Sequence, residues 1–152
     1  MYFEEFKIGM TASVPDAVIE KEKMLSFAEL YDNVPIHVDE EYAKRSPFGK
    51  PIAPGVMSFM SVWAKYLEID FFGEELLAGK STKIEWYKPV FAGDVLSSSV
   101  TVTSLTDRNP KNGIVEITIR SFNQHGDLVL TGVTEAIVKK ISENKKSGRF
   151  FV

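Results

Sequence analysis

The chain has 152 residues, of which 44% are hydrophobic and 26% are charged, and its net charge at pH 7 is −3. This composition indicates a single globular domain with a sizeable core, and the weak negative charge gives no electrostatic reason to expect a nucleic acid partner. Because the sequence contains no cysteine, it excludes a disulfide framework, a thiol nucleophile and a zinc–thiolate site.

The first part of the chain is predicted to form a short edge strand and an amphipathic helix. Residues 1–9 lack the basic region and apolar run of a signal peptide, so we expect a cytoplasmic protein without a membrane partner. A strand is expected over 11–14, ended by Pro15. Residues 21–31 carry apolar side chains at helical spacing, which predicts a helix that stops before Pro35.

The next stretch, 32–53, contains three prolines and one glycine and is predicted to be mainly irregular. Within it, Asp39 is expected to cap one or two helical turns that run through Arg45, with acidic residues at the start and basic residues at the end. A loop of this length in a compact domain is more often functional than idle. We therefore look for candidate catalytic residues here.

A helix is predicted over 54–67, and its apolar residues cover every side, with Lys65 the one charged residue. A helix that is apolar all round must be buried all round. At about 1.5 Å per residue it is roughly 21 Å long, too short for a bilayer but a good match to a strand of about six or seven residues. Because Gly55 leaves the first-turn amides open to a ligand, we predict a central helix inside a curved sheet, with its N-terminus free for chemistry.

After residue 80 the apolar pattern changes to the alternation that is typical of strands. Strands separated by turn sequences are expected over 82–86, 96–103, 115–120 and 128–138. A helix followed by such a meander predicts an α+β fold with an antiparallel sheet of four or more strands, and its free edges favour a two-fold dimer. We expect one domain over 1–140 and a basic C-terminal tail over 141–152.

The residues best suited to chemistry are Asp32 and His37, five positions apart on a proline-stiffened loop, together with the open amides at Gly55. A carboxylate and an imidazole near a helix N-terminus can activate a water and stabilise an oxyanion, as chemistry on a carbonyl compound requires. Two plainer interpretations remain open. Asp32 could cap the preceding turn, and His37 could be a solvated loop residue.

The loop resembles the motif of the MaoC-like dehydratases, which include the (R)-specific enoyl-CoA hydratases of the hotdog fold. Their motif is approximately Gly-Asp-x-Asn-Pro-(Ile/Leu)-His, followed later by the His-Gly that opens the hotdog helix. Four residues of the loop match this motif: Asp32, Pro35, Ile36 and His37. Gly55 matches the glycine, and the segments 3–9 and 87–94 are also similar to the family.

The resemblance implies an α+β hotdog fold, in which a curved antiparallel sheet wraps a long central helix. It implies an enzyme in which Asp32 and His37 hold the water that adds to C3 of a trans-2-enoyl-CoA while a proton goes to C2. The amide of Gly55 would bind the thioester oxygen. The family requires no metal and no cofactor apart from the coenzyme A of its substrate, and the expected assembly is a homodimer or a dimer of such dimers.

The chain departs from the motif at three positions. Val34 stands in place of the asparagine, Pro54 in place of the histidine, and Trp63 in place of a serine in the helix. We therefore expect an altered acyl pocket, whose substrate-binding residues are Val34, Pro54, Val56, Phe59 and Trp63, although helix core is the plainer role for Phe59 and Trp63. Two other functions stay open, namely an acyl-CoA thioesterase on the same fold and a non-catalytic dimer module that binds an acyl thioester.

Overall fold

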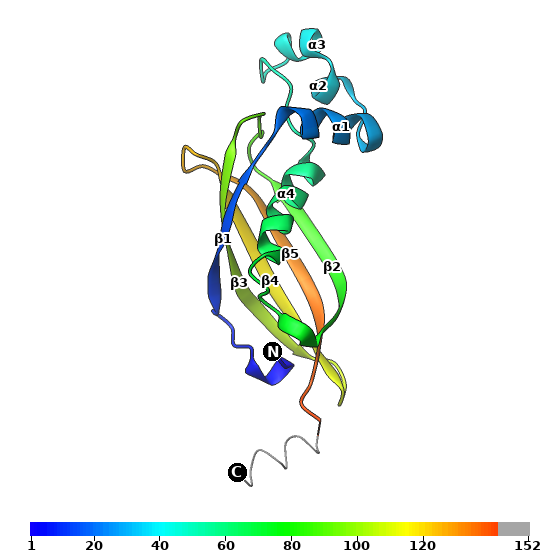
Figure 1. Ribbon diagram of the computed structural model, residues 1–152, viewed down its shortest axis with the longest axis vertical. Coiled ribbons are helices and arrows are strands. Elements are labelled where there is room, and N and C mark those ends of the chain that lie inside the picture. Colours follow the sequence, from blue (N-terminus) through cyan, green and yellow to red (C-terminus); the bar gives the residue numbers. More distant parts are fainter. Residues whose placement is uncertain (143–152) are drawn as a thin grey trace.

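The computed structural model, which describes residues 1–142, shows a curved antiparallel sheet with a long helix across one face (Figure 1). In chain order the elements are η1 (Phe3–Glu5), β1 (Thr11–Val18), α1 (Lys21–Tyr31), α2 (Pro35–Val38), α3 (Glu40–Lys44), α4 (Gly55–Leu67), η2 (Gly73–Glu75), β2 (Leu76–Trp86), β3 (Val95–Asp107), β4 (Asn112–Phe122) and β5 (Leu128–Lys139). The predicted α+β architecture is therefore confirmed.

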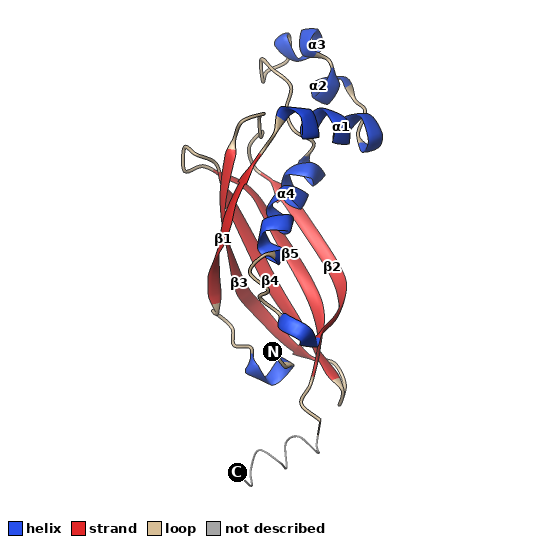
Figure 2. Ribbon diagram, in the orientation of Figure 1, coloured by secondary structure: helices blue, strands red, loops and turns tan. Residues whose placement is uncertain are grey.

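The sheet has five strands in the order β1-β3-β4-β5-β2, all antiparallel to their neighbours (Figure 2). The alternation predicted from the sequence is observed in β4. Val115, Ile117 and Ile119 are fully buried, whereas Glu116 and Thr118 between them are only partly buried. Within residues 1–142, the strands at the two edges, β1 and β2, each have one side without a partner strand.

Both edge strands are longer than the sequence predicts. The end predicted at Pro15 is wrong, because β1 continues to Val18. Proline is tolerated there because β1 is an edge strand and its register against β3 shifts between Val14 and Ala17, so the missing N–H breaks no regular ladder. On the other edge, β2 begins at Leu76, earlier than expected, since its pairing with β5 starts at that residue.

The stretch 32–53 contains more helix than predicted, and its helices gather with α1 at one end of the molecule (Figure 1). The predicted helix after Asp39 is confirmed as α3, and the Asp39 carboxylate accepts a hydrogen bond of 3.0 Å from the N–H of Tyr42. The helix α2 was not predicted, because four residues are too few to show a helical period. It begins at Pro35, at the position where a missing N–H costs nothing.

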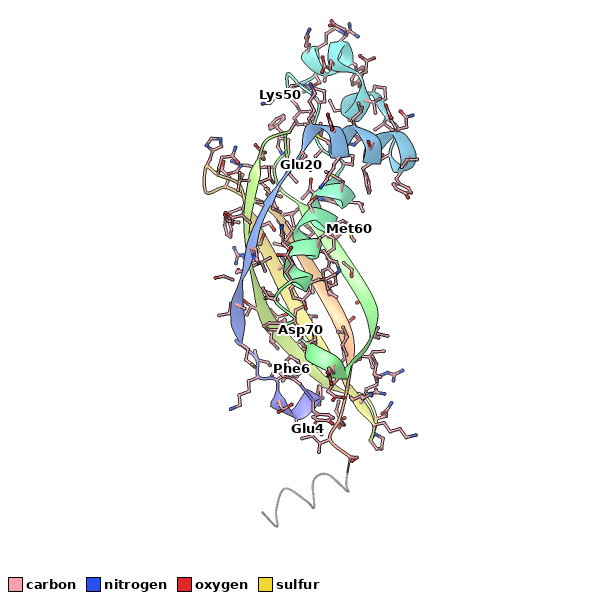
Figure 3. The ribbon with its side chains drawn as sticks, viewed as in Figure 1. Glu4, Phe6, Glu20, Lys50, Met60 and Asp70 are labelled. Carbon is pink, nitrogen blue, oxygen red and sulfur yellow. The ribbon has the colours of Figure 1, made fainter. Side chains whose placement is uncertain are left out.

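The central helix α4 is present as predicted, but the prediction that it is buried on every side is wrong for the single chain. Phe59 and Val62 are buried against the sheet. Val56, Met60 and Leu67, which we call the α4 stripe, are 48%, 47% and 57% exposed; Figure 3 labels Met60. One sheet covers only one side of a helix, so an all-round apolar helix keeps an uncovered face.

The end of the described chain packs against its beginning. Ile141, beyond β5, is buried, and its N–H donates a hydrogen bond of 3.0 Å to the Glu4 carboxylate. The rest of the predicted basic tail, 143–152, lies outside the described residues. Within residues 1–142 no helix is long and apolar enough to cross a membrane.

The packing of α4 on the sheet depends on a glycine. A Cβ added to Gly132 in β5 would lie 2.3 Å from Cε2 of Phe59, so we expect Gly132→Ala to lower the free energy of unfolding by about 1–3 kcal/mol through overpacking. The matched control is Gly79→Ala in β2, where nothing lies within 4 Å of the added Cβ. Urea denaturation measures both variants, and an equal loss in the two would contradict this account.

Candidate active site

Asp32 and His37 approach each other at the end of the molecule where α1, α2 and α3 gather. Asp32 follows the last turn of α1, and His37 lies in α2. The Nε2 atom of His37 is 3.2 Å from Oδ2 of Asp32. Since the His37 side chain is 10% exposed and that of Asp32 is 45% exposed, His37 is not the solvated loop residue of the plainer interpretation.

Contacts with Ile52 orient the His37 ring. Its Nδ1 atom lies 2.7 Å from the carbonyl oxygen of Ile52, and because a carbonyl oxygen can only accept, Nδ1 carries the hydrogen and donates it. When the ring is neutral, the lone pair is therefore on Nε2, the nitrogen nearest Asp32. In return the N–H of Ile52 donates to the carbonyl of Ile36 at 3.3 Å, so α2 is tied to the segment that enters α4.

The N-terminus of α4 offers free hydrogen-bond donors to this site. Pro54 occupies the N-cap position and has no side-chain oxygen to cap the helix. Among residues 1–142, the N–H groups of Gly55 and Val56 donate to no acceptor. The helix dipole adds positive potential at the same place, so a negatively charged or carbonyl oxygen is favoured there.

These groups share one cavity of about 460 Å³. Its lining includes Asp32, His37, Gly55, Val56, Trp86 and Tyr87. Ser58 also lines it, although its hydroxyl donates at 3.3 Å to the carbonyl of Pro54 in its own helix. The cavity therefore combines two acceptors, in the carboxylate and the imidazole, with first-turn amide donors.

The structure places the predicted pocket residues in different surroundings. Val56 lines the cavity, but the other four do not. Val34 is 42% exposed before α2, and Pro54 is fully buried. Phe59 turns toward the sheet and packs on Gly132, while Trp63 lines a second cavity of about 180 Å³ near the C-terminal end of α4. Phe59 and Trp63 are four positions apart, so the helical period places both on the side of α4 that faces the sheet.

Tyr66 also lines the second cavity. Burial, together with the nearby Asp70 carboxylate, raises the pKa of Tyr66, so this phenol stays protonated at neutral pH.

Among residues 1–142, no three His, Cys, Asp or Glu side chains gather closely enough to hold a metal ion.

Sequence analysis missed the contribution of the end of β2 to the site. Trp86 and Tyr87 line the cavity, followed by Lys88. Alternation along this strand does place Trp86 on one face with Thr82 and Ile84, and this face turns toward α4. No local pattern could show that the helix start lies opposite Trp86, because the contact joins residues far apart in the chain.

The comparisons with known proteins agree on one family for this chain. Residues 5–123 match the MaoC like domain. The uncharacterized protein YdeM of Bacillus subtilis (strain 168) is 28% identical over 144 residues, which cover 92% of this chain and 100% of that protein. The (R)-specific enoyl-CoA hydratase of Aeromonas caviae is 33% identical over 119 residues, which cover 77% of this chain and 83% of that enzyme.

Solved structures share the fold. The structure of a monoamine oxidase regulatory protein from Archaeoglobus fulgidus superimposes with a TM-score of 0.88 at 30% identity and covers 93% of this chain and 96% of its own. The HadBC complex, a (3R)-hydroxyacyl-ACP dehydratase from Mycobacterium tuberculosis, superimposes with a TM-score of 0.73 at 26% identity, over 88% and 98% of the two chains. The hotdog architecture expected from the sequence is thereby confirmed.

The geometry around Gly55 leads to a testable expectation. A Cβ added there would lie 2.4 Å from Cε2 of Trp86, so we expect Gly55→Ala to push the indole toward solvent. In a Trp63→Phe background Trp86 is the one remaining tryptophan, and its emission should move to longer wavelength. Gly79→Ala in the same background is the control, and an unchanged spectrum in both would contradict the contact.

Proposed function

Because the chain belongs to the MaoC-like domain family of hydratases and dehydratases, we propose that it adds water across the 2,3 double bond of a trans-2-enoyl-CoA, and runs the reverse dehydration of a 3-hydroxyacyl-CoA. The observation that carries this proposal is the 3.2 Å approach of His37 Nε2 to Asp32, in the same cavity as the amide of Gly55, which donates no hydrogen bond within residues 1–142.

The first step uses the two acceptors. With Nδ1 bonded to the carbonyl of Ile52, the lone pair of His37 Nε2 accepts one hydrogen of a water, and the Asp32 carboxylate accepts the other. The water oxygen attacks C3 as Nε2 takes its proton, and the electron pair of the double bond moves to the thioester oxygen. The neighbouring Asp32 carboxylate stabilises the imidazolium that forms.

The second step depends on the helix start. The enolate oxygen carries the negative charge, and the N–H of Gly55 donates to it with support from the α4 dipole. Return of the proton to C2 then collapses the enolate to the 3-hydroxyacyl thioester. The atoms balance with water as the one co-substrate.

The residues that differ from the family motif lie where they favour a catalytic function over a function limited to binding. Val34 and Pro54 lie outside the lining of the cavity, so neither substitution removes a polar group from it. A thioesterase would also use an acidic residue and a helix N-terminus, but it would not need an imidazole whose free nitrogen faces the carboxylate.

Hydration of crotonyl-CoA, followed as loss of enoyl absorbance, tests the proposal. We expect His37→Ala and Asp32→Asn each to lower kcat/KM by about 10²–10⁴-fold, because general acid–base catalysis is removed. The matched control is His125→Ala, since this second histidine is exposed in the turn between β4 and β5. Equal rates in all the variants would remove the pair from the mechanism, and release of free thiol without absorbance loss would favour the thioesterase.

We also propose that the chain forms a homodimer through β2 and α4. In the part of the chain that the structure describes, the outer side of β2 has no partner strand, and Leu77, Trp86 and Tyr87 are 48%, 47% and 49% exposed. The α4 stripe adds further uncovered apolar surface. Unpaired edges and apolar faces of this kind are normally covered in two-fold assemblies.

Light scattering tests this assembly. We expect the wild type to be dimeric and Met60→Glu to be largely monomeric, because the interface would have to bury an unpaired charge. Leu30→Glu on α1, where the side chain is 73% exposed, is the matched control and should stay dimeric. A monomeric wild type, or equal behaviour of the two variants, would contradict the proposed interface.

A further inference from the structure

Trp86 reaches from the end of β2 to the first turn of α4. Its backbone pairs with Leu130 of β5, and the next N–H, that of Tyr87, donates to the carbonyl of Val129 at 2.8 Å, so the strand end is held in place. An ideal Cβ on Gly55 would lie 2.4 Å from Cε2, 2.6 Å from Nε1 and 2.7 Å from Cζ2 of the indole. The part of the ring that carries the N–H is therefore the part beside the helix start.

The indole N–H has no acceptor among residues 1–142, although its ring lines the cavity that contains the Asp32–His37 pair. An indole nitrogen can only donate, and because Trp86 is half-exposed, an acceptor from a bound molecule can reach it. The N–H groups of Gly55 and Val56 next to it also have no acceptor in the described chain. Donors from the end of β2 and from the first turn of α4 thus line the same cavity without an acceptor in residues 1–142, and the oxygen of a ligand bound there would satisfy them.

We propose that Trp86 is a catalytic residue whose Nε1–H donates a second hydrogen bond to the thioester oxygen, beside the N–H of Gly55. This inference rests on the proposed hydratase function. As the electron pair moves from the double bond to that oxygen, negative charge grows between two fixed donors, and both hydrogen bonds strengthen. The close approach also gives glycine at 55 a second role, since any Cβ would displace the indole from this position.

The variant Trp86→Phe keeps an aromatic ring and removes the donor. We expect kcat for crotonyl-CoA to fall by about 10²-fold with little change in KM, as for the loss of one oxyanion donor. Tyr31→Phe on α1 is the matched control, because its ring packs on Phe27 outside the cavity and its side chain is 75% exposed. Urea denaturation of both variants confirms that they fold.

A second measurement does not depend on turnover. Butanoyl-CoA labelled with ¹³C at the thioester carbon has no double bond to hydrate, and isotope-edited infrared spectroscopy reports the stretching frequency of its bound carbonyl. We expect a lower frequency on the wild type than on Trp86→Phe, because two donors polarise the carbonyl more than one. Equal frequencies would overturn the proposal.

The two measurements separate the possible failures. A wild type that binds butanoyl-CoA with a lowered carbonyl frequency but does not hydrate crotonyl-CoA would reject the proposed function and retain Trp86 as a donor. A Trp86→Phe enzyme with unchanged kcat and altered preference for acyl length would show that the indole is only a wall, which would overturn the inference.

Discussion

Two hydrogen bonds between α2 and the segment that enters α4 determine the geometry of the candidate site. The N–H of Ile52 donates to Ile36, and the ring of His37 donates back to the carbonyl of Ile52. These bonds tie α2, and with it His37, to the segment that leads into the helix start. With them, one imidazole nitrogen is occupied by the backbone and the other is directed at the carboxylate, so orientation and tautomer have the same physical cause.

The sheet covers α4 on one side only, and the candidate site lies at the start of the same helix. The residues of α4 that face the sheet form the core, and the α4 stripe does not. Within residues 1–142 the outer edge of β2 has no partner strand, and it ends beside Trp86 and Tyr87, which line the cavity that contains Asp32 and His37. In the proposed dimer, covering the apolar surface and completing the walls of the cavity would be coupled, because the same strand end takes part in both.

Local patterns predicted those features that depend on neighbours in the chain. The apolar content of 54–67 predicted α4, the carboxylate of Asp39 predicted the start of α3, and alternation predicted the central strands. Local patterns failed where long-range pairing decides the outcome. β1 passes Pro15 because its partner tolerates a shifted register, β2 extends to Leu76 because β5 is there to pair with it, and α2 is too short to show a period.

The sequence by itself determined the α+β class, the catalytic candidates Asp32, His37 and Gly55, and the family, because each depends on residue types at short spacing. Only the tertiary structure decided which other side chains meet them. It placed Phe59 in the core and Trp63 at a second cavity, and it brought Trp86 from the distant end of β2 to the amides of α4. The reason is that a strand's alternation specifies which face a side chain occupies, whereas the element opposite that face depends on how the whole sheet folds over the helix.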